Sequence, residues 1–296
     1  MDKAHRNTIF VEDAEVLSQI PHEAGQFILR VSAPKCATNA TPGSFAHVAC
    51  HAELPMRRPL SIMRASPEEG WVEFLYKIVG HGLKYLAQLE AGDRVSILGP
   101  IGQGFRLHTE HDRPLMIGGG VGIPPMVFLA ESIVRQKAAW TPLVLMGSEI
   151  PFPFQTRPST IVVQGIPDGV IAGMPLLDGW GIASRLASGE DFPGCYQGFV
   201  TDLAGEWLGA QDQDALARIE IFACGPTPML KATAALARRF GVACQLCLEE
   251  YMACGVGGCA GCTVLVQTAH GPAMKRVCVD GPVFEAGAVY PEVSET

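Results

Sequence analysis

Three cysteines in one glycine-rich loop constrain this chain more than any other feature. Cys254, Cys259 and Cys262 are spaced as C-x4-C-x2-C, and Cys278 follows at a distance. This is the ligand spacing of a plant-type [2Fe-2S] cluster. The glycines between the cysteines permit the positive φ that a tight loop around two irons requires, and their backbone N–H groups can point at sulfur, which favours the reduced cluster. The sequence therefore predicts a one-electron carrier with these four cysteines as metal ligands.

A zinc site is the main alternative for the same thiolates. Structural zinc normally takes its ligands from two separated C-x2–4-C knuckles, whereas here three cysteines share one loop, so the spacing favours iron. Cys244 and Cys247 form a further C-x2-C pair, but they lie in the apolar run 242–248. Such a run is typical of a buried strand in which cysteine acts as a small apolar residue. Unliganded thiols are the third interpretation.

Composition indicates a globular chain with more than one domain. Its 296 residues are 48% hydrophobic and 18% charged, which is enough for two domains and a short extension. The net charge is −8 and no basic run is present, which argues against a nucleic-acid partner. The longest apolar stretch, 114–130, carries glycines and prolines and is short for a membrane span, so no membrane partner is expected.

A cytoplasmic location is expected from the N-terminus and the cysteine usage. Residues 1–7 are charged and lead into 8–11 without the apolar core of a secretory signal. Ten cysteines in a chain that is not exported favour metal ligation or buried thiols over disulfides.

The first part of the chain is patterned as short β-strands. Residues 71–79 alternate in part, with Glu73 and Lys77 on one face, which predicts a half-buried strand. Residues 80–89 are predicted to form the one helix of this region. The spacing of the runs predicts a small antiparallel β-barrel, assigned to residues 1–108. The β-patterned runs are 27–31, 45–50, 60–63, 71–79 and 94–98.

From residue 109 the pattern changes to apolar strands that alternate with helices. This alternation predicts a parallel sheet covered on both faces, a Rossmann-like α/β domain over 109–243. The segment 165–191 has no clear assignment. Residues 244–296 are expected to form a small iron-sulfur domain, in which the strand 263–266 returns Cys278 to the cluster. The fold class is thus β plus α/β. The predicted strands are 114–117, 142–146, 160–163 and 220–223, and the predicted helices are 124–137, 182–188, 199–208 and 228–240.

A glycine-rich turn follows the first apolar strand of the second domain. Gly118 opens it, and Gly120, Gly122 and Pro125 complete a G-x-G-x-x-P pattern that leads into a helix. Free amides at a helix start can approach a pyrophosphate or ribose. A tight turn without a ligand is the alternative, because a glycine motif of this kind is weak by itself.

Five motifs in order resemble the ferredoxin-reductase flavoprotein family. They are R-P-x-S at 58–61, G-H-G at 80–82, the segment 98–105, the glycine turn, and C-G-P at 224–226. The resemblance implies FAD on the barrel, with Arg58 on the pyrophosphate and Ser61 at flavin N5. Family members usually carry Ser or Thr where Leu83 stands here, so one hydroxyl contact is missing. The FAD-binding residues that the resemblance implies are Arg58, Pro59, Leu60, Ser61, Gly80 and Gly82.

The same resemblance implies that NAD(H) is bound by the second domain. It makes Ser61 and Cys224 the catalytic residues, with Cys224 orienting the nicotinamide ring; a buried cysteine at a strand end is the alternative for Cys224. Glu149 at a strand end could bond a ribose diol and favour NAD over NADP, or be a solvated carboxylate. The implied NAD-binding residues are Gly118, Gly120, Gly122, Pro125, Cys224, Gly225 and Pro226.

The C-terminal segments narrow the resemblance. Residues 198–203, 248–262 and 276–284 resemble the electron-transfer subunits of dihydroorotate dehydrogenase. This implies a separate FMN-containing catalytic subunit as partner, with electrons passing through the cluster and FAD to NAD. Two alternatives stay open. The chain could be an NAD(P)H-linked reductase subunit of a hydrogenase, transhydrogenase or ferredoxin system, or a redox- or metal-sensing binding protein without turnover.

Overall fold

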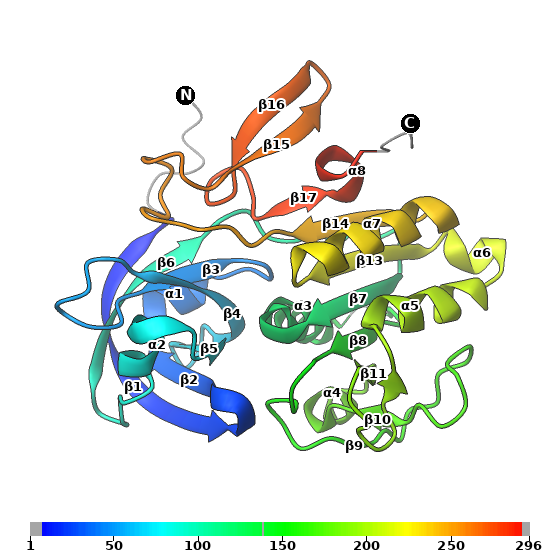
Figure 1. Ribbon diagram of the computed structural model, residues 1–296, viewed down its shortest axis with the longest axis horizontal. Helices are drawn as coiled ribbons and strands as arrows, with labels where there is room; N and C mark the ends of the chain where they lie inside the picture. The colour runs from blue at the N-terminus through cyan, green and yellow to red at the C-terminus, as the bar shows by residue number, and fades with distance from the viewer. Residues whose placement is uncertain (1–7, 138, 292–296) are drawn as a thin grey trace.

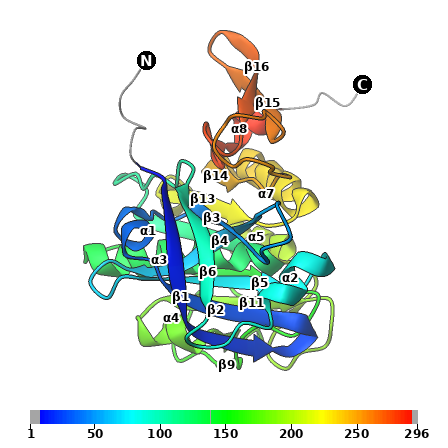
Figure 2. The ribbon, with the colours of Figure 1, turned by 90° about the vertical axis from the view of Figure 1, so that its left-hand side faces the viewer.

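A barrel and a layered α/β sheet lie side by side in the computed structural model, and a β-hairpin near the C-terminus projects beyond one edge of the sheet (Figures 1 and 2). The structure describes residues 8–137 and 139–291. The charged start 1–7, on which the expectation about a secretory signal rests, lies outside the described residues. No helix in the described part of the chain is long and apolar enough to cross a membrane.

The N-terminal body is a closed antiparallel barrel of six strands, which confirms the predicted fold. Apolar side chains such as Val16, Leu29 and Phe74 are fully buried inside it, and they drive its closure. The short helices α1 (Pro34–Asn39) and α2 (Gly80–Leu86) lie against it. In order around the barrel the strands are β1 (Phe10–His22), β2 (Gln26–Ser32), β5 (Trp71–Lys77), β4 (Arg58–Ser66), β3 (Phe45–Val48) and β6 (Arg94–Ile101), which pairs with β1.

Three expectations for the barrel were wrong in detail. β1 was missed as a long strand because acidic and polar residues interrupt its apolar pattern. α1 is a second helix beside the expected one. β5 is buried on both faces and not on one. Its Glu73 carboxylate can be buried because it accepts hydrogen bonds from Arg30 at 3.0 and 3.1 Å.

The second body is a seven-stranded sheet with helices on both faces, as predicted (Figure 1). Side chains alternate between its faces. Leu115 and Ile117 pack with α5 (Val200–Gly209) and α7 (Thr227–Phe240), while Met116 packs with α3 (Ile123–Gln136). The strand order is β12 (Tyr196–Gln197), β11 (Ala183–Ser188), β8 (Leu143–Gly147), β7 (Arg113–Gly119), β13 (Ile219–Cys224), β14 (Ala243–Cys247) and β17 (Val283–Glu285).

Two elements of this body differ from the sequence prediction. The expected helix 182–188 is strand β11, every residue of which is buried. Pairing with β8 and burial outweigh the helix propensity of its Ala and Leu residues. The expected strand 160–163 is irregular, with Val162 92% exposed. Two short strands, β9 (Arg157–Pro158) and β10 (Ala172–Gly173), and the helix α4 (Pro175–Gly179) lie on either side of it instead.

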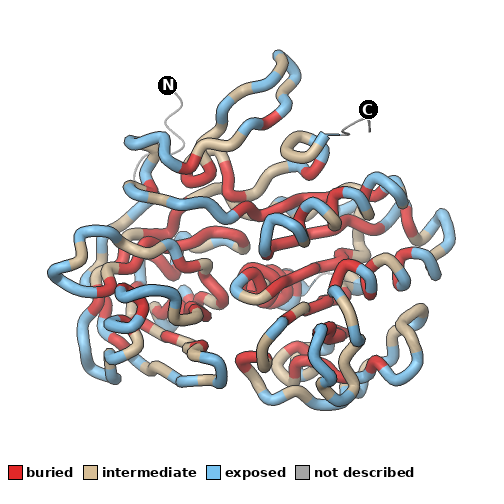
Figure 3. The backbone as a smooth tube through the Cα atoms, viewed as in Figure 1, coloured by how far each residue is buried: buried red, intermediate tan, exposed pale blue. Residues whose placement is uncertain are grey.

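The C-terminal segment leaves the sheet and returns to it. After β14 the chain forms the cysteine loop, then the hairpin of β15 (Thr263–Thr268) and β16 (Gly271–Arg276). It re-enters the sheet as β17, which pairs with β14 and, within 8–137 and 139–291, is the only antiparallel strand of this sheet, and it is followed by the short helix α8 (Ala286–Val289). The hairpin strands are mostly of intermediate burial with some exposed residues, whereas the sheet and barrel interiors are buried (Figure 3). The cysteine loop and the hairpin together are therefore anchored on the sheet at both ends, by β14 and β17.

Candidate functional site

The four predicted cluster cysteines lie on the loop 254–262 and just after β16. The Sγ atoms of Cys262 and Cys278 are 3.4 Å apart. The Cys254 Sγ accepts hydrogen bonds from the backbone N–H of Gly258 at 3.2 Å and of Cys259 at 3.4 Å. Partial burial opposes ionisation of Cys254, but the backbone N–H groups of Val256, Cys259 and Gly258 and the Cys259 side chain outweigh it and lower its pKa to about 7. The loop thus supplies the N–H donors that thiolate ligands require.

The cysteines lie in two groups, which suits a two-iron cluster better than one zinc ion. Four thiolates on a single zinc would have sulfurs all about 3.8 Å apart. Among the described residues, no three of the cysteine Sγ atoms lie within 4.8 Å of one another. Cys262 pairs with Cys278, while Cys254 and Cys259 share the turn of the loop. Two ligands on each of two irons require two such pairs.

His47 lies beneath the cysteine loop and was not found by sequence reasoning. It is on β3 and has no solvent exposure. A side chain at Gly255 would stand only 2.9–3.0 Å from its ring atoms, so the loop backbone rests directly on the imidazole. Neither ring nitrogen has a hydrogen-bond partner among the described residues. Burial and the nearby Arg57 lower its pKa to about 4, so the ring is neutral.

The predicted FAD residues come together at the mouth of the barrel. Arg58 and Ser61 lie on β4, and Gly80 to Gly82 form the first turn of α2. A Cβ atom on Gly82 would lie 3.2 Å from Arg58 Nη2, so the guanidinium packs directly on this glycine. The arrangement puts a guanidinium fork beside the backbone amides of a helix start, which is donor chemistry suited to a pyrophosphate. Leu83, where the family usually has a hydroxyl, is buried in the barrel core.

An ion pair links β4, the strand that carries Arg58 and Ser61, to the second domain. Arg64 on β4 donates from Nε and Nη2 to Oε1 of Glu131 on α3, at 3.0 and 2.8 Å. Arg135, one turn further along α3, donates to the backbone oxygen of Ala65. α3 begins directly after the glycine turn, so these contacts fix the predicted FAD and NAD sites relative to each other.

The predicted NAD residues lie at the carboxyl ends of two neighbouring strands. Gly118 on β7 pairs with Cys224 on β13. Gly122 packs so closely on the Cys224 carbonyl that a Cβ atom would collide with it, and Gly120 has a φ of +54°. Pro125 follows in the first turn of α3. This edge of a parallel sheet is where nucleotides commonly bind.

Cys224 and Glu149 differ in accessibility. Cys224 is fully buried, and its hydrogen bond with Cys247 and its burial raise its pKa, so its thiol stays protonated beneath the turn formed by Gly225 and Pro226. Glu149 is exposed just beyond the end of β8. The structure thus leaves the Glu149 carboxylate free to meet a ligand and keeps the Cys224 side chain inside the protein.

A second polar cluster was also missed. His108, His111 and Glu220 gather where the barrel-to-sheet linker crosses β13. The H-x2-H spacing at 108–111 was visible in the sequence, but Glu220 lies more than a hundred residues away, and only the fold brings it close.

Comparisons with known proteins agree with the cysteine loop and the whole fold. Residues 249–290 match the family model described as the iron-sulfur cluster binding domain of dihydroorotate dehydrogenase B. The electron transfer subunit of dihydroorotate dehydrogenase B (NAD(+)) from Caldanaerobacter subterraneus is 34% identical over 84% of this chain and 86% of its own. The corresponding subunit from Geobacillus thermodenitrificans is 34% identical over 94% of this chain and 98% of its own.

Solved structures place the fold among ferredoxin reductases. An NADH-dependent reduced ferredoxin-NADP oxidoreductase covers 94% of this chain and 90% of its own, with a TM-score of 0.72 and 25% identity. The ferredoxin reductase of carbazole 1,9a-dioxygenase, with a TM-score of 0.59 and 22% identity over 79% of this chain and 67% of its own, shares the fold. Since curated relatives that are 34% identical span most of both chains, the protein belongs to the family of dihydroorotate dehydrogenase B electron transfer subunits.

Proposed function

We propose that this chain passes electrons between a partner dehydrogenase and NAD through a [2Fe-2S] cluster and FAD, in the oxidation of dihydroorotate for pyrimidine biosynthesis. The relatives are electron transfer subunits of the NAD(+)-linked dihydroorotate dehydrogenase B. When bound, FAD supplies two-electron hydride chemistry and the cluster supplies one-electron transfer. The partner is an FMN-containing catalytic subunit, and the complex is cytoplasmic.

One observation carries the proposal: a single strand, β3, lies between the cysteine loop and β4, the strand that carries Arg58 and Ser61. Gly255 of the loop rests on His47 of β3, and His47 pairs with Pro59 of β4, next to Arg58. A short path therefore connects the two predicted cofactor sites through β3.

In the proposed arrangement each module holds one group. Residues 1–108 hold FAD, with Arg58 and the amides near Gly80 and Gly82 on the pyrophosphate, Pro59 and Leu60 along the flavin, and Ser61 close to N5. Residues 109–243 bind NAD(H) at Gly118, Gly120, Gly122 and Pro125, and Cys224, Gly225 and Pro226 shape the floor beneath the nicotinamide. Residues 244–296 hold the cluster, with Cys254 and Cys259 on one iron and Cys262 and Cys278 on the other.

An anaerobic reconstitution tests the proposal. The holoprotein is mixed with the FMN-containing catalytic subunit of a relative, dihydroorotate and NAD. We expect the flavin absorption to bleach on addition of dihydroorotate and NADH to form. The same sample should contain two irons and one FAD per chain, with no zinc in place of iron at the cysteines. Intact FAD and cluster without bleaching would reject the dihydroorotate assignment, and zinc in place of iron would reject electron transfer altogether.

A matched variant separates the two halves of the path. Cys262→Ser should lose the cluster, and with it the dihydroorotate-driven formation of NADH, while NADH added directly still bleaches the FAD. Loss of both reactions would mean that the FAD and NAD sites depend on the cluster, against the proposed division between modules.

A ferredoxin-linked reductase is the second candidate. The solved structure with a TM-score of 0.72 over 94% of this chain is an NADH-dependent reduced ferredoxin-NADP oxidoreductase. The same cofactors would serve both functions, so the partner discriminates between them. Bleaching by reduced ferredoxin and not by dihydroorotate with its dehydrogenase would favour this candidate.

A further inference from the structure

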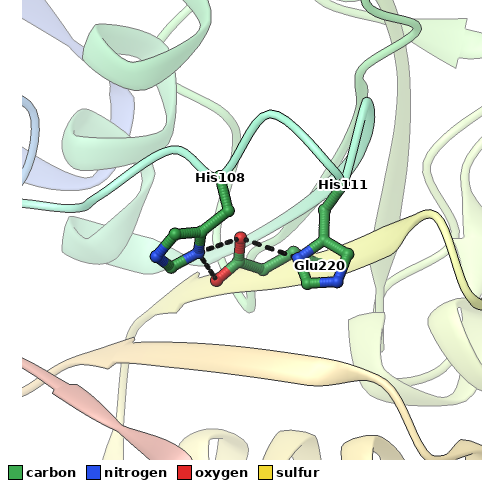
Figure 4. Close-up of side chains that lie close together, drawn as sticks. All are labelled: His108, His111 and Glu220. Carbon is green, nitrogen blue, oxygen red and sulfur yellow. Dashed lines mark hydrogen bonds and ion pairs between the residues drawn. The ribbon is translucent and has the colours of Figure 1, made fainter.

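His108, His111 and Glu220 form a cluster outside the proposed electron path (Figure 4). The two histidines lie on the linker between the barrel and β7. The backbone N–H of His111 donates to the His108 carbonyl at 3.0 Å, so a turn brings both imidazoles to the same side. Glu220 rises from β13 between them, and its side chain is only 1% exposed.

The ligand atoms are spaced as a metal ion would require. The Glu220 Oε2 atom lies 3.0 Å from His108 Nδ1 and 3.5 Å from His111 Nδ1. Zinc bonds to nitrogen and oxygen are about 2.1 Å long, so a tetrahedral centre sets neighbouring ligand atoms about 3.4 Å apart. His111 Nδ1 also lacks a hydrogen-bond partner among the described residues although it is buried. This nitrogen is therefore available to coordinate a metal ion.

A buried amide holds the carboxylate and the linker in place. Gln245 Nε2 donates to Glu220 Oε1 at 2.7 Å and to the Arg106 carbonyl at 2.6 Å. The Arg106 N–H donates in return to Gln245 Oε1 at 3.0 Å. Such supporting contacts orient metal ligands before the ion arrives. The histidine side chains, 41% and 23% exposed, leave an entry path from solvent.

We propose that His108, His111 and Glu220 form a binding site for a divalent transition-metal ion, with Zn²⁺ the best match to two imidazoles and one carboxylate. The site is distinct from the cysteine loop. It would tie the linker between the barrel and the sheet to β13, an inner strand of the sheet, with the fourth position open to water.

Metal uptake by the iron-loaded holoprotein tests this site. The protein is dialysed anaerobically against Zn²⁺, and zinc and iron are quantified together. We expect the wild type to take up one zinc per chain with its iron content unchanged. Its unfolding temperature should rise, because an ion that binds the folded state stabilises it. In His108→Gln/His111→Gln both effects should be lost. His270→Gln, on the exposed turn of the hairpin, is the matched control and should retain both.

Cobalt distinguishes this site from stray thiols. Co²⁺ bound by His108, His111 and Glu220 should give tetrahedral visible bands without the sulfur-to-metal charge-transfer band that cysteine ligands produce. Glu220→Gln keeps the shape of the buried side chain and should remove the visible bands. Equal uptake by wild type and the double variant, uptake by neither, or a charge-transfer band would overturn the proposal, and the cluster would then be a hydrogen-bonded group of charges only.

His47 supports a second and independent inference, which rests on the proposed function. A neutral imidazole carries one donor and one acceptor, and leaving both unpaired inside a protein is costly. His47 does so among the described residues, and its ring is covered by Gly255, the residue after Cys254. The geometry points to His47 as a positioning residue that donates its N–H to a sulfur of the bound cluster.

The midpoint potential of the cluster is the readout. A hydrogen bond to sulfur stabilises the reduced cluster, so its removal lowers the potential. His47→Leu should shift the cluster potential downward and change its EPR spectrum, with FAD content and flavin potential unchanged, and His47→Gln should restore part of the shift. A wild-type cluster potential and EPR spectrum in His47→Leu would overturn this role. Absence of cluster-to-flavin transfer in the wild type, whatever the His47 variants show, would instead contradict the proposed function.

Discussion

Arg58 and Gly82 illustrate how single residues define the proposed FAD site. The guanidinium of Arg58 packs on the bare Cα of Gly82, and its Nη1 donates to the Met56 carbonyl at 2.8 Å. The same Nη1 also donates to the Arg57 carbonyl at 3.4 Å, so Nη1 anchors the side chain and leaves Nε and Nη2 to face an anion. A side chain at position 82 would require the guanidinium to shift by a few tenths of an ångström, so the glycine helps to set the position of the arginine.

Arg58→Ala should therefore weaken FAD binding and leave the cluster intact. Hydrogen bonds to a charged group contribute about 1.5–3 kcal/mol, which corresponds to roughly 10- to 100-fold in the dissociation constant. Flavin fluorescence titration of the apoprotein measures this, with iron content as the internal check. Arg239→Ala, an exposed arginine on α7, is the control. Unchanged FAD affinity in Arg58→Ala would show that the pyrophosphate lies elsewhere.

At the scale of elements, the sequence correctly predicted the helices and strands whose apolar periodicity matches their burial in the structure. β7, β13, α3, α5 and α7 were found because apolar runs and helix starts are local signals. β11 was predicted as a helix because only its neighbours in the sheet make it a strand. The motif residues were visible as local patterns, whereas His47 and Glu220 were not, because their partners are distant in sequence.

The junction of β4 with α3 gives an element-scale prediction about stability. Arg64 lies mostly buried between the barrel and α3 and donates twice to Glu131. Arg64→Ala should lower the free energy of unfolding by about 1–3 kcal/mol. Arg94→Ala, which removes an exposed pair with Asp13, should cost less than about 1 kcal/mol. Urea unfolding of the holoproteins gives both values; equal losses would mean that the junction is not specially stabilised.

The close approach of the glycine turn after β7 to the end of β13 gives a second prediction at this scale. A Cβ atom in Gly122→Ala would strike the Cys224 carbonyl, so the glycine turn must open. We expect slower reduction of FAD by NADH, with FAD and iron contents retained. Gly189→Ala, where a Cβ atom meets nothing within 4 Å, should behave as wild type. Stopped-flow reduction under anaerobic conditions measures the difference, and equal rates in the two variants would remove the turn from the NAD site.

At the scale of the whole molecule, the cysteine loop and hairpin form a segment attached to the sheet at two points. β14 precedes the loop and β17 follows Cys278, and these strands pair with each other. Between them few apolar side chains are buried: Leu248 and Val277 join Cys262 and Cys278 in the core, and Val266 is buried on the hairpin. Such a small core holds little stability of its own, so the order of the segment depends on the metal that its cysteines share.

Iron removal should therefore loosen this segment and spare the barrel. Because metal binding contributes folding free energy, we expect residues 249–280 to exchange backbone hydrogens faster in Cys262→Ser than in the iron-loaded wild type, while β1 and β2 exchange at the same rate. Cys195→Ser removes a free cysteine far along the chain from the loop and should retain both iron and protection. Hydrogen-exchange mass spectrometry resolves the segments. Equal protection of 249–280 with and without iron would mean that β14, β17 and the hairpin hold the loop unaided, and that the thiolates are arranged before the cluster arrives.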